Sequence, residues 1–150
     1  MRSKTYFFIV FFFCLTLHQT QSQSVLGKWK TYDIFDRSKE EAIVEIYTLS
    51  NQLYVKIVEI LPEEHKNDLC KRCTGEEKDM PILGMVILKG ATLENGVWKG
   101  APILNAKNGK TYGCHISLAH KDLLKVRGFV GYPIFGKTLY WTRVKDRPFR

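Results

Sequence analysis

The feature that most constrains the fold is a series of short β-rich segments separated by turn residues. Such spacing is typical of antiparallel barrels and sandwiches. We expect strands at 27–35, 42–49, 53–61, 97–104, 111–118, 123–130 and 137–144. The apolar run 82–88 fits either a buried strand or a short helix, because periodicity does not separate the two. The count predicts an all-β domain, a single antiparallel up-and-down barrel of about eight strands, whose interior is either filled by side chains or able to hold one small ligand.

Apolar and polar residues alternate along the expected strands, and this alternation assigns their faces. In 111–118 one face carries Tyr112, Cys114, Ile116 and Leu118. In 123–130 the side opposite Lys125 and Arg127 carries Leu124, Val126, Gly128 and Val130. The apolar sets should point inward. Cys114 is then an interior, unreactive thiol.

The N-terminus has the pattern of a secretory signal peptide. Arg2 and Lys4 precede an apolar run at 6–17, and a polar stretch at 18–24 follows. A basic tip, a short apolar core and small residues before the cut define such leaders, and the run is too short to span a bilayer. We expect residues 1–24 to be removed near Ser24, which leaves a 126-residue domain, 25–150, in a secreted or periplasmic protein with no transmembrane segment.

The charge balance favours contact with anionic surfaces. Without the two basic residues of the leader, 21 basic residues face 15 acidic ones, a net charge of +6. An anionic envelope surface is one partner that fits this charge. The alternative is that lysines on the strands merely solvate an outer face. Nucleic-acid binding finds no support, because the charge is modest and no recognition motif is present.

Three cysteines follow the leader, and two of them form Cys70-Lys71-Arg72-Cys73. The oxidising compartment favours a structural disulfide between Cys70 and Cys73 that tightens the longest loop, 62–80. A redox or free dithiol is the second interpretation, since the flanking cations would favour thiolate. Half of a metal site is the third, but no second paired motif completes it, so no metal is expected.

Catalytic signatures such as the Gly-x-Ser-x-Gly elbow, the His-Glu-x-x-His pair and the glycine-rich phosphate loop are missing from the sequence. We therefore expect no catalytic residue and no cofactor. Three aromatic residues, Trp98, Tyr112 and Trp141, fall on expected inward faces and could line a ligand pocket or fill an ordinary core. Glu45 lies mid-strand; it marks a pocket if it faces inward and is ordinary if it faces outward.

Two pieces of sequence resemble known families. Gly27-Lys28-Trp29 in the first expected strand and Arg143 in the last resemble the Gly-x-Trp and distal Arg of lipocalin-like (calycin) barrels, in which the Arg packs over the Trp. The whole region 26–144 is similar to a bacterial family of exported proteins catalogued as domain of unknown function 2147. The similar stretches, in order, are 27–29, 42–47, 81–84, 108–112, 124–128 and 141–144. The sequence departs from the family at Asn105-Ala106 and at Lys137. The resemblance implies a lipocalin-like fold and structural roles for Trp29 and Arg143; it implies no reaction.

Three functions follow as hypotheses. The first is a non-catalytic exported barrel that binds a small, largely apolar ligand. The second is an envelope structural or interaction protein with a solid barrel, working through its basic outer face and the Cys70–Cys73 loop. An enzyme is the third, supported least.

Overall fold

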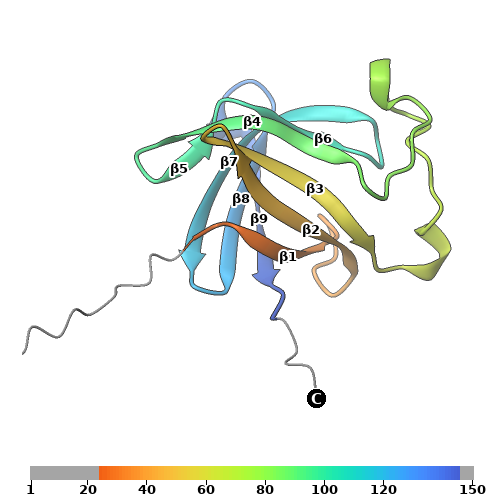
Figure 1. Cartoon of the computed structure of the whole chain (residues 1–150), viewed down its shortest axis with the longest axis horizontal. Coiled ribbons are helices and arrows are strands. Elements are labelled where there is room, and N and C mark those ends of the chain that lie inside the picture. The colour runs from red at the N-terminus through yellow and green to blue at the C-terminus, as the bar shows by residue number, and fades with distance from the viewer. Residues whose placement is uncertain (1–23, 146–150) are drawn as a thin grey trace, which may run out of the picture.

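Nine β-strands follow one another in the computed structural model, which describes residues 24–145, and each is antiparallel to its neighbours (Figure 1). The strands are β1 (Gly27–Tyr32), β2 (Glu40–Leu49), β3 (Gln52–Ile60), β4 (Val86–Glu94), β5 (Val97–Lys99), β6 (Pro102–Asn105), β7 (Lys110–His120), β8 (Leu123–Phe129) and β9 (Gly136–Arg143). Three single-turn 3₁₀ helices lie in the connections: η1 (Glu63–His65), η2 (Gly75–Glu77) and η3 (Pro133–Phe135).

The sheet closes into a barrel, which confirms the predicted fold. β9 pairs with β1, with Trp29 opposite Arg143 and Lys30 opposite Thr142. β3 pairs with β4, and β5 and β6 each lie between β4 and β7 as two halves of one strand position. The ring therefore has the expected eight positions, in sequence order. Among residues 24–145, closure gives the first and last strands, β1 and β9, a partner on both sides, which protects the edges where strand-to-strand aggregation usually begins.

Local chemistry explains where the strands depart from the predicted ranges. β1 ends at Tyr32 because the Asp33 carboxylate accepts hydrogen bonds from the backbone N–H groups of Phe35 and Asp36, at 2.7 and 2.9 Å, and turns the chain. The run 82–88 is neither one strand nor a helix: β4 begins only at Val86 and continues to Glu94. Gly100, with a φ of +88°, separates β5 from β6.

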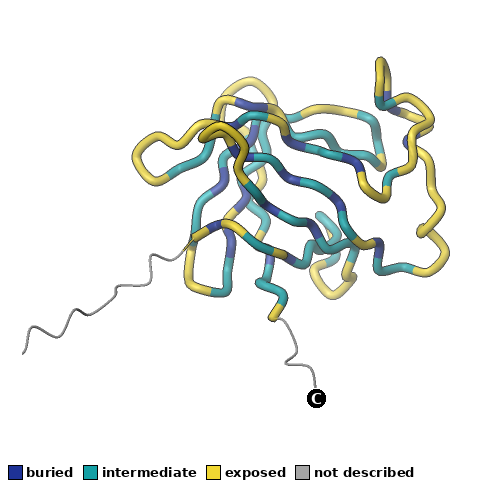
Figure 2. Tube along the Cα trace, viewed as in Figure 1, coloured by how far each residue is buried: buried dark blue, intermediate teal, exposed yellow. Residues whose placement is uncertain are grey.

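The alternation along the strands sets the core as predicted. Cys114, Ile116, Leu124 and Val126 are all buried. Val130 is the exception, because β8 has already ended at Phe129 and the side chain is exposed. Buried positions recur along β2, β3, β4, β7 and β8, while β9 has one, Trp141, and exposed positions gather in the turns (Figure 2).

The two ends of the barrel differ. At one, the closed end, lie the start of β1, the end of β9 and the turns β2–β3, β4–β5 and β7–β8. The Trp29 ring is fully buried there, and its indole N–H donates to the carbonyl oxygen of Val25 at 2.8 Å. The Arg143 guanidinium lies 4.1 Å from the centre of the Trp29 ring. It donates to the carbonyl oxygens of Ser24, Leu26 and Lys121 at 2.6, 2.9 and 3.0 Å. The structure thus brings together the two side chains singled out by the resemblance.

At the opposite, open end the long β3–β4 connection, residues 61–85, runs outside the barrel (Figure 1, right). A disulfide joins Cys70 and Cys73, with a Cα–Cα distance of 5.3 Å, as the compartment argument predicted. Both cysteines are buried with Met85 in a small second core against Leu104 and Ala106. The connection is therefore packed against the barrel wall.

The leader prediction concerns residues 1–24, which lie outside the described residues except for Ser24. Within 24–145 no helix is long and apolar enough to cross a membrane.

Candidate ligand-binding cavity

A cavity of about 830 Å³ occupies the open end of the barrel. Its walls are inward-facing apolar side chains from strands all around the ring. They include Val44 of β2, Ile57 of β3, Ile103 of β6, Val126 of β8, and Leu139 and Trp141 of β9. The β3–β4 connection contributes Ile82 and Leu69 to the same space. A concave, mostly apolar space of this size is typical of small-molecule sites.

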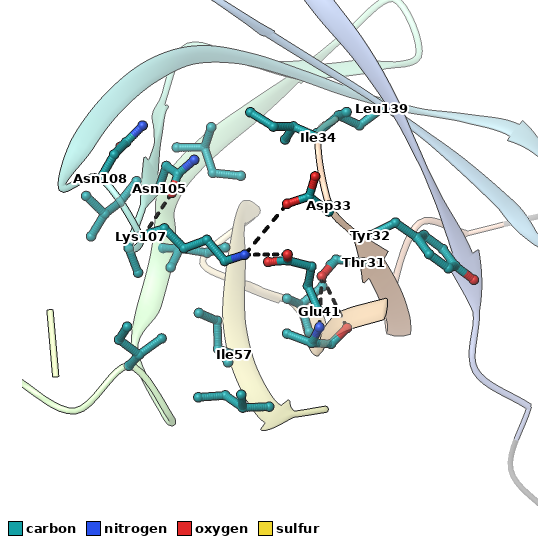
Figure 3. A pocket seen from close by; sticks show the side chains of 18 of the residues that line it. Thr31, Tyr32, Asp33, Ile34, Glu41, Ile57, Asn105, Lys107, Asn108 and Leu139 are labelled. Atoms are coloured by element: carbon teal, nitrogen blue, oxygen red, sulfur yellow. Dashed lines mark hydrogen bonds and ion pairs between the residues drawn. The ribbon is translucent and has the colours of Figure 1, made fainter. Parts of the chain in front are cut away.

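One lysine crosses the mouth of the cavity. Lys107, in the β6–β7 turn, extends its ammonium group to the carboxylates of Glu41, at the start of β2, and Asp33, just after β1 (Figure 3). The ammonium forms a hydrogen-bonded ion pair with Glu41 and lies 3.8 Å from the Asp33 carboxylate. The β6–β7 turn and the β1–β2 pair are far apart in the ring, so this contact joins two sides of the mouth.

The electrostatics of the mouth are set by hydrogen bonds as well as by charge. The N–H groups of Phe35 and Asp36 lower the pKa of the Asp33 carboxyl, and Lys107 acts in the same direction. Asp33 is therefore a fixed negative group facing Lys107. On the far rim His65 Nδ1 lies 2.9 Å from the Asp68 carboxylate, and both residues line the cavity.

Two of the four predicted ligand contacts line this cavity. Trp141 is almost completely buried and forms part of the wall. Tyr112 is half-buried, and its hydroxyl oxygen accepts a hydrogen bond from the Asn108 side-chain amide at 2.9 Å. This bond holds the polar end of Tyr112 at the rim.

The other two lie elsewhere. Trp98 of β5 packs against the main core and does not line the cavity. Glu45 sits between the buried residues Val44 and Ile46, so its side chain faces outward. This is the second of the two predicted alternatives, in which Glu45 does not mark a pocket. Neither residue enters the proposed site.

The sequence did not predict most of the residues that form the mouth of the cavity. Asp33, Glu41 and Lys107 come from three loops or strand ends, and no local spacing signals that they meet. One signal was available for Gly128, since the alternation had placed it on the inner face of 123–130. Gly128 lines the cavity, and a Cβ built there meets no atom within 4 Å. It therefore marks open space beside the wall.

The chemistry of the cavity suits reversible binding. No cluster of three or more potential metal ligands occurs among residues 24–145. Burial raises the pKa of the Cys114 thiol to about 12, so this free thiol keeps its proton at neutral pH. The residue is not among those that line the cavity. Apolar walls with a few polar groups at the rim offer a ligand desolvation and orientation.

Comparisons with known proteins fit this geometry. Residues 27–143 match the model of a family described as "Uncharacterized protein conserved in bacteria (DUF2147)". The chain belongs to this family. No curated protein matches the chain. Among solved structures, this DUF2147 chain is similar to one described as "Protein HP1028 from the human pathogen Helicobacter pylori belongs to the lipocalin family". The TM-score is 0.70 at 21% identity, over 82% of this chain and 84% of the other. At that identity the likeness shows a shared lipocalin-like fold.

Proposed function

We propose that this DUF2147 protein is a non-catalytic binding protein that holds a small, largely apolar molecule inside its barrel. The observation that carries the proposal is the cavity of about 830 Å³ with its apolar walls at the open end. A solid barrel, which the alternative hypothesis of an envelope structural protein requires, does not fit that volume. A lipocalin-like fold and the chemistry of the lining groups favour binding over catalysis.

The distribution of polar groups suggests how such a ligand would lie. Trp141, Val126 and Ile57 surround the inner part of the cavity, and charged side chains occur only at the mouth. An apolar body would displace water from the inner walls, while a polar end would remain near Lys107 and Tyr112. This arrangement would avoid burying an unpaired polar group.

Export to the periplasm or the outside is part of the proposal. It rests on the leader pattern of residues 1–24 and on the Cys70–Cys73 disulfide, which is favoured in oxidising compartments. Cleavage near Ser24 would leave residues 25–150, in which Val25 is the carbonyl partner of the Trp29 indole. Mass spectrometry of the protein recovered from its producing cell would locate the cut.

The cavity is tested by filling it. Gly128→Leu adds an apolar side chain at a position that faces the open space and has no positive φ. We expect binding of the neutral fluorescent probe N-phenyl-1-naphthylamine to weaken by about tenfold or more, because about 100 Å³ of the space is lost. Energy transfer from tryptophan to the probe that falls in a Trp141→Phe variant would report binding inside the cavity, because Trp29 and Trp98 do not line it.

The matched control is Lys125→Leu, which adds apolar bulk on the outer face of the same strand. It should bind the probe as the unmodified protein does. Equal binding by the Gly128→Leu variant, or no binding by the unmodified protein together with a bare mass in native mass spectrometry, would overturn the proposal.

A further inference from the structure

The most exposed apolar side chains of the described residues gather beside the cavity mouth. Val130, Tyr132, Ile134 and Phe135 form the corner between β8 and β9, and they are 69–77% exposed. Phe35, in the β1–β2 loop, is 86% exposed. Every other exposed large apolar side chain in residues 24–145 is at most 55% exposed. A gathering of this kind usually marks an interaction site. We call residues 130–135 the apolar corner.

The apolar corner has a fixed shape. The Arg127 guanidinium donates to the carbonyl oxygens of Pro133 and Ile134 at 2.8 and 3.2 Å, and to the Thr138 hydroxyl at 2.9 Å. The Phe135 N–H donates to the Tyr132 carbonyl oxygen at 3.0 Å. The carbonyl oxygens of Tyr132, Pro133 and Ile134 and the Phe135 N–H are thus already paired. Pairing of this kind removes the main cost of moving backbone into lipid.

The corner adjoins the mouth of the cavity. Gly128 and Lys137, which lie on either side of it in the chain, both line the cavity. The Lys137 ammonium donates to the Ile34 carbonyl oxygen and lies 4.7 Å from the centre of the Phe35 ring. Phe35 itself is also a lining residue. The exposed apolar surface is therefore continuous with the interior.

The charge around the corner is positive on balance. Residues 123–137, which lead into and out of the corner, contain Lys125, Arg127 and Lys137 and no Asp or Glu. The loop that carries Phe35, residues 33–40, contains Arg37 and Lys39 beside Asp33, Asp36 and Glu40, so the two segments together hold five basic and three acidic residues. A projecting apolar tip with aromatic side chains and flanking cations is the pattern of segments that enter the interface of an anionic membrane.

We propose that the apolar corner, with Phe35, docks the protein on the surface of an anionic lipid bilayer. Docking would turn the mouth of the cavity toward the membrane. This inference goes beyond ligand binding and rests mainly on residues 130–135, none of which lines the cavity, so either can fail without the other; Phe35 and Lys137 are shared by the two sites.

The test is sedimentation with lipid vesicles. One set contains phosphatidylcholine alone, and the other contains about 30 mol% phosphatidylglycerol in addition. We expect the protein to bind the anionic set about tenfold more tightly, with an affinity that falls as salt is added. The double variant Ile134→Ser, Phe135→Ser should weaken this binding by about tenfold or more, because it removes the side chains that would enter lipid.

The matched control is Leu49→Ser with Leu93→Ser, which removes two exposed apolar side chains at the closed end. The unmodified protein and the two double variants have the same N-terminus. Any vesicle binding by the N-terminal segment is therefore equal in all three proteins. The control should bind vesicles normally. Unchanged probe binding by the corner variant would show that its cavity is intact.

Three results would overturn the proposal: no binding of the unmodified protein to anionic vesicles, equal binding by the corner variant, or equal loss in the closed-end control. Concentration-dependent dimers that the corner variant abolishes, without any vesicle binding, would assign the corner to a second copy of the chain instead.

Discussion

At the scale of single residues, Arg143 stabilises the fold through stacking and hydrogen bonds, and not through its charge alone. Its side chain is only 23% exposed, it stacks on the buried Trp29 ring, and it donates to the carbonyl oxygens of Leu26 and Lys121, which remain after cleavage near Ser24, as well as to that of Ser24. A guanidinium can do this because it has five donors in one plane and keeps its charge. The residue thereby ties the segment before β1 and the β7–β8 turn to the last strand.

Replacing Arg143 by Leu should lower the free energy of unfolding by about 2–4 kcal/mol, since the stacking is lost and the carbonyl groups lose their donors. Arg143→Lys should recover only part of this loss, because one ammonium group cannot reach the divergent carbonyl oxygens of Leu26 and Lys121 while it stacks on the Trp29 ring. Urea unfolding followed by tryptophan fluorescence measures both effects. The control is Arg37→Leu, since the exposed Arg37 lies 5.8 Å from the Tyr140 ring; its cost should stay within about 0.5 kcal/mol. Equal losses at the two positions would contradict this account of Arg143.

The free thiol of Cys114 makes a second residue-level prediction. Burial raises the pKa of this thiol to about 12, from an ordinary value near 9. Between these values the unfolded chain releases the proton and the folded chain keeps it. The thiol's contribution to stability is therefore complete below about pH 9 and is lost as the pH rises toward 12.

Relative to a Cys114→Ala variant, the unfolding free energy should accordingly fall by up to about 1.4 kcal/mol per pH unit above pH 9. At pH 8 a thiol reagent should label Cys114 only after denaturation, and the variant supplies the blank. Rapid labelling of Cys114 in the folded protein would show that the thiol is accessible.

At the scale of elements, the β3–β4 connection depends on one glycine in another turn. Gly109, with a φ of +70°, lies so close to the connection that an added Cβ would overlap the carbonyl oxygen of Arg72. The contact places the disulfide-bearing segment directly on the β6–β7 turn. A side chain at 109 would have to push the two apart.

Gly109→Ala should therefore raise hydrogen-exchange rates in residues 70–73 by about tenfold or more and destabilise the protein by about 2 kcal/mol or more. Gly96→Ala is the matched control, because Gly96 also has a positive φ, +78°, but no atom lies within 4 Å of its added Cβ. Gly96→Ala should lower the free energy of unfolding by about 1 kcal/mol, the strain of a positive φ at alanine. It should leave the hydrogen-exchange rates of residues 70–73 unchanged. Identical exchange in the two variants would refute the close contact.

The elements also show what the sequence could reveal. Alternation in 111–118 and 123–130 predicted the inward faces, and the turn residues between runs predicted the hairpins. Errors occurred where tertiary contacts decide the local structure, as at 82–88, where Gly84 N–H donates to the Ile57 carbonyl oxygen before β4 begins. In the cavity, Trp141 and Tyr112 followed from strand faces. Lys107, Asp33 and Glu41 did not, because closure of the whole barrel is what brings these positions together.

At the scale of the whole molecule, barrel closure creates a cavity whose entrance is crossed by Lys107. The side chain is 59% exposed, so its ion pairs with Glu41 and Asp33 are worth little to overall stability, about 1 kcal/mol or less. An energy of this size can still change the rate at which a ligand dissociates. A ligand leaving through this mouth would have to pass the bridge, and each rearrangement of the bridge breaks contacts between opposite sides of the barrel.

Lys107→Met should consequently raise the dissociation rate of N-phenyl-1-naphthylamine by about threefold, the factor that corresponds to about 0.6 kcal/mol. Added salt should raise the rate for the unmodified protein and have little effect on the variant, since screening weakens only the ion pairs that remain. Lys110→Met is the control, because Lys110 lies in the same hairpin, is exposed and forms no ion pair with residues 24–145. Stopped-flow measurement of probe release gives all three rates. A Lys107→Met rate equal to that of the control would mean that the bridge lies beside the exit path instead of across it.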